Sequence, residues 1–273
     1  MVYKGCDVGS AKPEPSILSK YPHHLIDCIE PNSIFNVADF YNKSMKLIDE
    51  IHSKDKLPLF VGGSMMYFRS LLIGLDDLPY RNATYRQELE DIKDNQGLKI
   101  LYSKLLKEDP IYAKKIQSSD GQRIVRALEV IELTGKPFSS LIGIKNKNLL
   151  KDKFNVKQYA IYEEDRSLLH SRIEDRLKKI IESGLVSEVN ELFTTYDIPK
   201  DHPIRKSVNY KQAIGFINNE YNTDEFFNKA LYATRQLAKR QITWLRSWDD
   251  VNFYDIKSKN MIKEDIKRLV TSL

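Results

Sequence analysis

Cysteine is scarce in this sequence, which has 273 residues and two cysteines, Cys6 and Cys28. No basic and then apolar stretch typical of a secretion signal precedes Cys6. The sequence therefore predicts a protein of the reducing cytoplasm, in which both thiols are small side chains without chemistry. The five histidines are scattered and show no zinc-ligand spacing, so no metal site made by protein side chains alone is predicted.

Long hydrophobic runs are also missing. The longest candidates, residues 57–61 and 71–73, fall far short of the ~18 apolar residues that a membrane-spanning helix requires. The mean hydropathy is -0.47 and charged residues make up 30% of the chain, which is typical of a soluble globular protein. We therefore expect no membrane span, and one large domain or two smaller ones.

Familiar nucleotide and nucleophile motifs are absent as well. The sequence contains no G-x-x-x-x-G-K-[ST] phosphate loop, no dinucleotide-binding fingerprint and no nucleophile elbow. Gly135-Lys136 is followed by Pro137 and lacks the upstream glycine.

Positive charge is concentrated toward the end of the chain. The net charge is only +5, but residues 205–246 contain eight basic and three acidic residues, and residues 226–248 contain no acid. This charge distribution is typical of a surface that binds phosphate groups. A solvated charged helix is the alternative interpretation.

Apolar spacing predicts mainly helices. A helix is expected over residues 36–51, followed by a short buried parallel strand over 57–61, the turn Gly62-Gly63, and a helix from Ser64 through Leu72. Four helical patterns, over 85–92, 98–106, 111–116 and 123–133, predict a small helical insert. A strand over 155–162 and helices over 167–183 and 224–248 follow.

Two groups could bind an anionic ligand. The turn before Ser64 would present free backbone amides at the start of a helix, where an anion could bind. Alternatively, the glycines allow tight packing and nothing more, and Ser64 serves as the N-cap of the helix without binding a ligand. Arg172 and Arg176 lie four residues apart on one helical face, where a diphosphate would fit between them. Ordinary pairing with Glu174 and Asp175 is the alternative.

Two further segments could contact RNA. In residues 233–246, Arg235, Lys239 and Arg246 fall within about 40° of one another on a helix, with Thr243, Trp244 and Trp248 at its far end. Basic and aromatic groups together suit RNA, although basic helices that bind nothing are common. In residues 120–124, Asp120 could be only a helix cap, or Gln122 and Arg123 could point donors at a base or backbone.

Several segments together resemble the bacterial tRNA dimethylallyltransferases. The resemblance rests on Tyr3-Lys4-Gly5 through Pro13, Val61-Gly62-Gly63-Ser64 through Phe68, residues 120–123 with 126–130, and the whole of residues 233–246. These segments cover nearly the full chain in the family's order.

The resemblance implies an α/β fold with a P-loop NTPase-like parallel-sheet core and a helical insertion domain. The core would comprise residues 1–79 and 151–273, and the insertion residues 80–150. The implied reaction transfers a dimethylallyl group from dimethylallyl diphosphate to N6 of adenine 37, next to the anticodon, in tRNAs that read codons beginning with U. Mg²⁺ would help to hold the diphosphate, the adenine would be flipped out of its stack, and a monomer is expected.

The resemblance also assigns roles to particular residues. Ser64 takes the place usually held by a threonine near the target adenine, and Arg176, with Arg172 beside it, matches the arginine that reaches the diphosphate. The predicted tRNA contacts, from the basic stripe and the resemblance together, are Ser64, Arg86, Asp120, Gly121, Gln122, Arg123, Ile124, Arg205, Lys206, Ser207, Val208, Asn209, Tyr210, Arg235, Lys239, Arg240, Gln241, Ile242, Thr243, Trp244, Leu245 and Arg246.

The sequence departs from the family at two places. The first strand, the phosphate loop and the aspartate that serves as general base have no counterpart here, because Met1-Val2 stand where that stretch should end. The family's usual glycine in the loop 205–210 is Asn209, which tolerates a left-handed backbone better than other residues.

These departures predict a truncated chain that binds tRNA with little or no transfer activity, and a catalytically inactive tRNA-binding fragment is the alternative. A small-molecule phosphotransferase on a similar fold is disfavoured by the segment 233–246.

Overall fold

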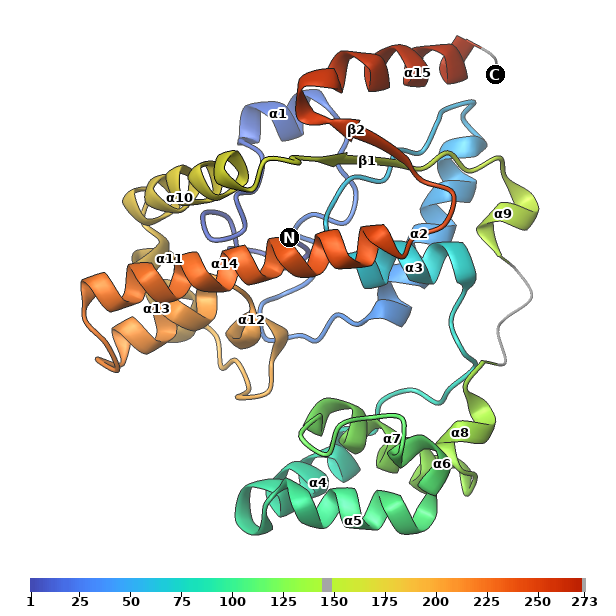
Figure 1. The fold of residues 1–273 in the computed structure, drawn as a ribbon, viewed down its shortest axis with the longest axis vertical. Helices are drawn as coiled ribbons and strands as arrows, with labels where there is room; N and C mark the ends of the chain where they lie inside the picture. The colour runs from blue at the N-terminus through green and yellow to red at the C-terminus, as the bar shows by residue number, and fades with distance from the viewer. Residues whose placement is uncertain (144–148, 272–273) are drawn as a thin grey trace. The chain divides into compact units, whose positions relative to one another are not determined.

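The computed structural model describes residues 1–143 and 149–271, which separate into two compact units (Figure 1). One unit comprises residues 1–67 and 157–273, and the other comprises residues 68–156. Among the described residues, no helix is both long and apolar enough to cross a membrane.

The first unit is mostly helical. Helices α10, α11, α13 and α14 pack in series, each against the next, and α14 also packs on α10. The elements of this unit, with α3 running across its boundary, are α1 (Pro15–Lys20), α2 (Val37–His52), α3 (Met65–Ile73), β1 (Tyr159–Tyr162), α10 (Arg166–Glu182), α11 (Leu185–Thr195), α12 (Pro203–Lys206), α13 (Tyr210–Ile217), α14 (Thr223–Arg246), β2 (Asn252–Asp255), the 3-10 helix η1 (Ile256–Ser258) and α15 (Lys259–Thr271).

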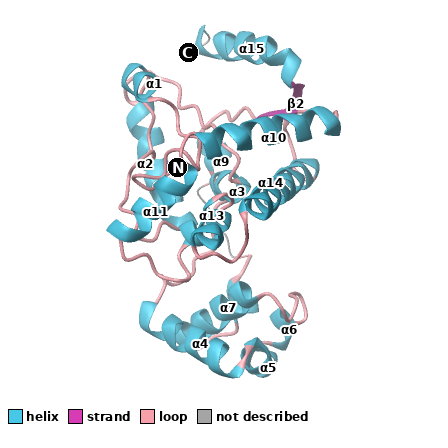
Figure 2. Ribbon diagram, turned by 90° about the vertical axis from the view of Figure 1, so that its left-hand side faces the viewer, coloured by secondary structure: helices cyan, strands magenta, loops and turns pink. Residues whose placement is uncertain are grey.

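The sheet of this unit is small. Strands β1 and β2 pair in parallel, with Tyr159 opposite Asn252 and Tyr162 opposite Asp255. Figure 2 shows these two strands among helices and loops. A single parallel bridge joins Tyr3 to Ile29. The expected parallel pairing is thus present in a two-stranded form.

The prediction of a buried strand over residues 57–61 is wrong. These residues form neither strand nor helix, and Leu59 and Val61 are 62% and 85% exposed. A parallel strand is held by hydrogen bonds to neighbouring strands, and in the described part of the chain none pairs with this segment. An apolar run indicates that a segment is suited to burial, but it does not show whether a neighbouring strand is present to pair with it.

The predicted helices of this unit are confirmed, and polar caps explain where they begin. Asn36 accepts hydrogen bonds from the amides of Ala38 and Asp39 at 2.8 and 3.0 Å, and the Asp39 side chain accepts one from the Asn36 amide at 2.9 Å. Asn222 and Glu225 form the same reciprocal box at the start of α14. Each box satisfies amides that have no partner within the helix.

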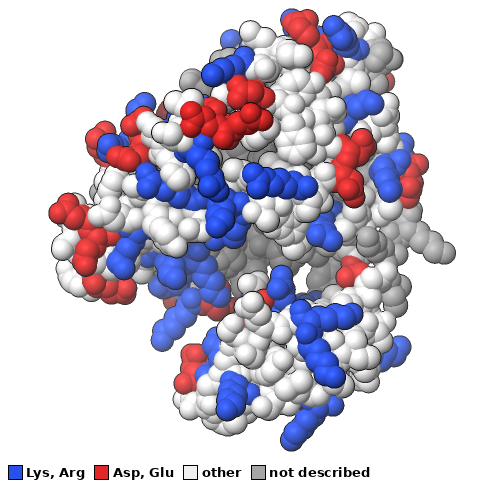
Figure 3. All heavy atoms as spheres, in the orientation of Figure 1, with Lys and Arg blue, Asp and Glu red and all other residues white. Residues whose placement is uncertain are grey.

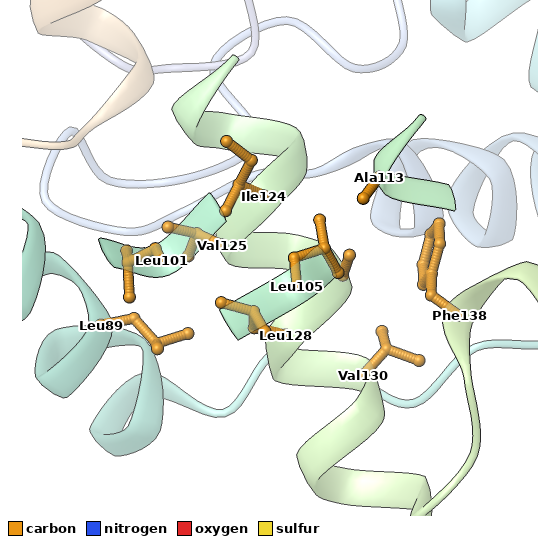
Figure 4. Close-up of a cluster of buried hydrophobic side chains, with 10 residues drawn as sticks. Leu89, Leu101, Leu105, Ala113, Ile124, Val125, Leu128, Val130 and Phe138 are labelled. Carbon is orange, nitrogen blue, oxygen red and sulfur yellow. The ribbon is translucent and has the colours of Figure 1, made fainter. Parts of the chain in front are cut away.

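The second unit is a helical cluster with one apolar core. It contains the remainder of α3 and α4 (Ala83–Gln96), α5 (Leu98–Glu108), α6 (Pro110–Ala113), α7 (Gly121–Thr134), α8 (Phe138–Leu141) and α9 (Leu150–Lys153). Figure 4 shows Leu101 and Leu105 of α5 facing Ile124 and Leu128 of α7. The four predicted helical patterns are confirmed here, although 111–116 is helical only at its start, in α6.

Two buried carboxylates support this core. Asp109, 1% exposed, accepts hydrogen bonds from the Tyr112 amide at 2.9 Å and from the amide and hydroxyl of Ser139 at 2.6 and 2.8 Å. Glu129 is fully buried and accepts from the Asn82 amide and the Arg126 guanidinium at 2.8 and 2.7 Å. Both carboxylates are therefore satisfied, as buried charges must be.

Candidate functional site

The glycine turn before α3 lies directly against α14. The Gly63 carbonyl accepts a hydrogen bond from Nε2 of Gln241 at 3.0 Å, and a Cβ at Gly63 would lie 2.3 Å from that nitrogen. Glycine thus allows the close approach. Ser64 is exposed immediately before α3, and its carbonyl accepts from the Tyr67 amide at 2.8 Å.

Helix α14 presents one basic face to solvent. Lys239, Arg240, Thr243 and Arg246 are exposed, while Phe226, Ala230 and Leu231 on other sides of the helix are buried. Figure 3 shows Lys and Arg side chains gathered over the region of this helix. The mutual repulsion of exposed cations along one helix face favours an anionic ligand there.

Arg235 does not share this exposed face. Its guanidinium is half-buried and donates to Glu174 of α10 at 3.4 Å, and Glu174 also pairs with Lys178 at 3.0 Å. The predicted stripe of Arg235, Lys239 and Arg246 is therefore reduced to its last two members, since Arg235 ties α14 to α10.

The aromatic end of α14 is anchored to the protein. The Trp248 indole donates to Oε1 of Gln158 at 2.8 Å, and its ring centroid lies 6.2 Å from that of Trp244. The Thr243 hydroxyl donates to the Lys239 carbonyl of its own helix at 2.9 Å. These contacts fix the end of α14 next to the segment that leads into β1.

The two arginines of α10 differ in their surroundings. Arg172 lies 3.6 Å from a carboxylate oxygen of Glu163, whose side chain is only 6% exposed. Arg176 is exposed, and in the described part of the chain no carboxylate lies within ion-pair distance of it. Glu174, weighed from the sequence as a partner of these arginines, pairs with Lys178 and Arg235. Arg176 is thus the more available cation.

The loop 203–210 is tightly held. The Nε of Arg205 donates to the Ile198 carbonyl at 2.9 Å, and its guanidinium lies 4.3 Å from the centroid of the Phe193 ring. The Ser207 hydroxyl donates to the Pro203 carbonyl at 2.8 Å.

Asn209 has the positive φ expected from the sequence. Its φ is +73°, in the region that favours glycine, and its Nδ2 donates to the Gly9 carbonyl at 3.1 Å. The φ is positive as expected, although the ψ of -51° lies outside the left-handed helical region, and the side chain adds a contact that glycine could not make.

A carboxylate that sequence reasoning missed joins this loop to the start of the chain. Glu188 of α11 accepts hydrogen bonds from the amides of Asp7, Val8 and Gly9 at 2.9, 2.5 and 3.1 Å, and from the Tyr210 hydroxyl at 2.7 Å. Burial raises the pKa of Tyr210, and the nearby Cys6 and Glu188 raise it further, so the hydroxyl stays protonated and donates. No short-range sequence signal marks this contact, because it spans about 180 positions.

The neighbouring Cys6 thiol is fully buried. Burial raises the pKa of this thiol to about 11, so the protonated form is favoured at neutral pH.

The remaining predicted contacts belong to residues 68–156. Asp120 caps α7, since its side chain accepts from the Arg123 amide at 3.2 Å and pairs with the Arg123 guanidinium at 2.9 Å. Arg123 and Gln122 are exposed, and Arg86 of α4 is half-buried. Ile124 is fully buried in the core, so its side chain is not available to RNA.

The basic face of α14, the glycine turn and the arginines of α10 define a protein suited to phosphate-bearing ligands. A family model described as IPP transferase matches residues 1–248. The chain belongs to the IPP transferase family, which confirms both the predicted family and the prediction of a transferase.

Particular relatives support this assignment. The chain is 42% identical over 269 residues to a tRNA dimethylallyltransferase of Acinetobacter baumannii, covering 97% of this chain and 84% of the relative. It is 30% identical to the full-length tRNA isopentenylpyrophosphate transferase of Bacillus halodurans, with a TM-score of 0.66, covering 98% of this chain and 84% of that one. A eukaryotic dimethylallyltransferase acting on tRNA shares the fold, with a TM-score of 0.73 at 22% identity, covering 93% of this chain and 65% of that one.

The Mg²⁺ ion implied by the family resemblance has no side-chain site of its own here. Among residues 1–143 and 149–271, no three His, Cys, Asp or Glu side chains lie together as metal ligands. Mg²⁺ is commonly held by one or two carboxylates together with the phosphates of a substrate, so such a cluster is not required for it.

Proposed function

We propose that this chain acts in the transfer of a dimethylallyl group from dimethylallyl diphosphate to N6 of adenine 37 in tRNAs that read codons beginning with U. The observation that carries the proposal is the 42% identity, over 97% of the chain, to a tRNA dimethylallyltransferase. The basic face of α14 supports it, because its exposed cations suit the phosphates of RNA.

In the proposed reaction, the C–O bond between the allylic carbon and the diphosphate breaks, and diphosphate leaves with the electron pair. The adenine N6 forms a bond to that carbon and loses a proton. Arg176, exposed on α10, would bind the departing diphosphate, with Arg172 beside it. Ser64, at the turn held by Gln241, would position the adenine.

The RNA would be bound by segments of both units. Lys239, Arg240 and Arg246 would neutralise phosphates, and the loop 205–210 would be presented by its contacts with Phe193 and Gly9. In the other unit, Arg86, Gln122 and Arg123 are the proposed contacts. We further propose that the fold is the P-loop NTPase-like α/β core of the family with a helical insertion, acting as a monomer.

A second candidate is tRNA binding with weak transfer, and a specific observation favours it. The 273 residues of this chain contain no glycine-rich phosphate loop, and the family resemblance assigns none of them to the general base. A positioned general base contributes roughly 10²- to 10⁴-fold, and anion stabilisation a comparable factor. We expect a polypeptide of these 273 residues to bind tRNA but to transfer the group far more slowly than a family enzyme that has both elements.

The test incubates this polypeptide with tRNA, dimethylallyl diphosphate and Mg²⁺, and measures tRNA binding and prenylated adenine separately. A tRNA with guanine in place of the target adenine is the matched control. If the polypeptide forms prenylated adenine as fast as an intact family enzyme does, the second candidate, tRNA binding with weak transfer, is excluded. Failure to bind tRNA would refute both.

A further inference from the structure

A groove lies between α12, α13 and the first half of α14. Arg205 at its edge is already a proposed RNA contact, whereas its residues on α14 lie before the proposed contacts of the second half of that helix. Its volume is about 670 Å³, and Arg205, Lys211 and Lys229 line it together with Tyr221 and Tyr232. Glu220 is an acid in its lining. The groove is therefore electropositive.

The cations of the groove are held without carboxylate partners. The Lys229 ammonium lies 5.2 Å from the centroid of the Tyr221 ring, and Arg205 lies over Phe193 in the same manner. In the described part of the chain, no carboxylate lies within ion-pair distance of Lys229, Lys211 or Arg205. Aromatic rings position Lys229 and Arg205 without neutralising their charges, so the groove can accept an anion.

The floor of the groove is fixed. The Tyr221 hydroxyl donates to the Gln212 carbonyl at 2.9 Å and lies against Gly215, where a Cβ would be 2.1 Å from the hydroxyl oxygen. Only glycine leaves room for this tyrosine. The ring beneath Lys229 is therefore held in place by the backbone of α13.

The groove continues the basic face of α14. At about 100° per residue, Lys229 and Tyr232 point to the same side of the helix as Lys239, Arg240 and Thr243. Lys229 precedes Lys239 by ten positions, or about 15 Å along the helix axis. Tyr232 lies between them and is 66% exposed, so its ring is accessible from solvent.

We propose that this groove is a second RNA subsite, in which Lys229 contacts a phosphate of the anticodon arm and Tyr232 stacks on a base or ribose. The proposal rests on the proposed function, since the same RNA would lie along the whole exposed face of α14. Uncompensated cations alternating with an exposed aromatic ring are the groups that bind RNA backbone and unstacked bases. The charge of the groove favours RNA over an acidic small molecule because it is continuous with a face about 25 Å long.

The test measures binding of a stem-loop RNA with the anticodon-arm sequence at several salt concentrations, using the whole chain. Lys229→Gln should weaken binding about threefold to tenfold and lower the slope of log affinity against log salt by about one. Tyr232→Ala should weaken binding about fivefold or more, whereas Tyr232→Phe, which keeps the ring, should bind as the unaltered protein does.

Two comparisons make the outcome decisive. Lys267→Gln removes the same charge from an exposed position on α15 and should leave the salt slope unchanged. If Lys239→Ala weakens binding while Lys229→Gln and Tyr232→Ala do not, the second subsite is overturned and the proposed function stands. If the unaltered chain does not bind the RNA, the proposed function fails.

Discussion

The apolar core of residues 68–156 joins side chains that are close in sequence, whereas the other unit adds to its own apolar core several hydrogen bonds between segments far apart in the sequence. In residues 68–156, Leu101 and Leu105 pack with Leu128 of a helix that follows within 30 residues. In residues 1–67 and 157–273, Glu188 binds the amides of residues 7–9, and the buried His202 donates from Nε2 to the Ser33 carbonyl at 2.7 Å.

This difference teaches which forces hold each unit. Apolar burial is non-directional and depends on area, so the helical insert tolerates rearrangement but responds to lost volume. Buried hydrogen bonds are directional, and a single unsatisfied donor costs ~1–3 kcal/mol. In the unit of residues 1–67 and 157–273, the hydrogen bonds of Glu188 add this directional constraint to the apolar core, next to the proposed RNA-binding loop 205–210.

The largest effect is expected in the insert. Leu128→Ala removes a fully buried side chain and should lower the free energy of unfolding of that unit by about 2–5 kcal/mol. Hydrogen exchange should show faster opening within residues 68–156. Leu133→Ala, on the same helix but 40% exposed, should change the free energy by less than ~1 kcal/mol. If backbone amides of both units lost equal protection from hydrogen exchange, the inference that Leu128 stabilises residues 68–156 in particular would be wrong.

A smaller effect is expected from Glu188→Gln. Glutamine keeps the shape of the side chain but replaces one acceptor oxygen by an NH₂ group. Four groups donate to Glu188, two to each oxygen, so two of them lose their acceptor. We expect a loss of about 2–3 kcal/mol. Faster exchange should appear at residues 7–9 and 205–210, with residues 68–156 unchanged. Glu191→Gln, exposed on the same helix, is the matched control, and an equal effect from it would remove the special role of Glu188.

The smallest effect is expected at Asn209, where backbone and side chain contribute separately. Asn209→Gly loses the hydrogen bond to the Gly9 carbonyl but removes the Cβ that is strained at a positive φ, whereas Asn209→Ala loses the bond and keeps a Cβ there. The alanine variant should be less stable than the glycine variant by about 1 kcal/mol in chemical denaturation. Equal stability of the two variants would show that the backbone at this position relaxes.

The sequence predicted the parts of the fold whose cause is local. The helices over residues 36–51, 167–183 and 224–248 follow from apolar spacing and from caps such as Asn36 and Asn222, all within a few residues of one another. The segment 57–61 was predicted wrongly because strand pairing depends on partners far away in the chain.

The candidate site was predictable in the same uneven way. The exposed positions of Lys239 and Arg246 follow from helical periodicity. The pairing of Arg235 with Glu174, and the placement of Gln241 on the Gly63 carbonyl, depend on how α10, α14 and the glycine turn pack. Periodicity predicts on which face of its own helix a residue lies. It does not predict which other segment packs against that face, because that depends on the tertiary structure.

Three consecutive amides that point at one carboxylate are the arrangement with which many proteins capture phosphate. Here Glu188, tethered on α11, is present at an effective concentration that a dissolved anion at cellular levels does not match. The three amides of residues 7–9 are therefore already occupied by the protein's own carboxylate and do not form an open anion site.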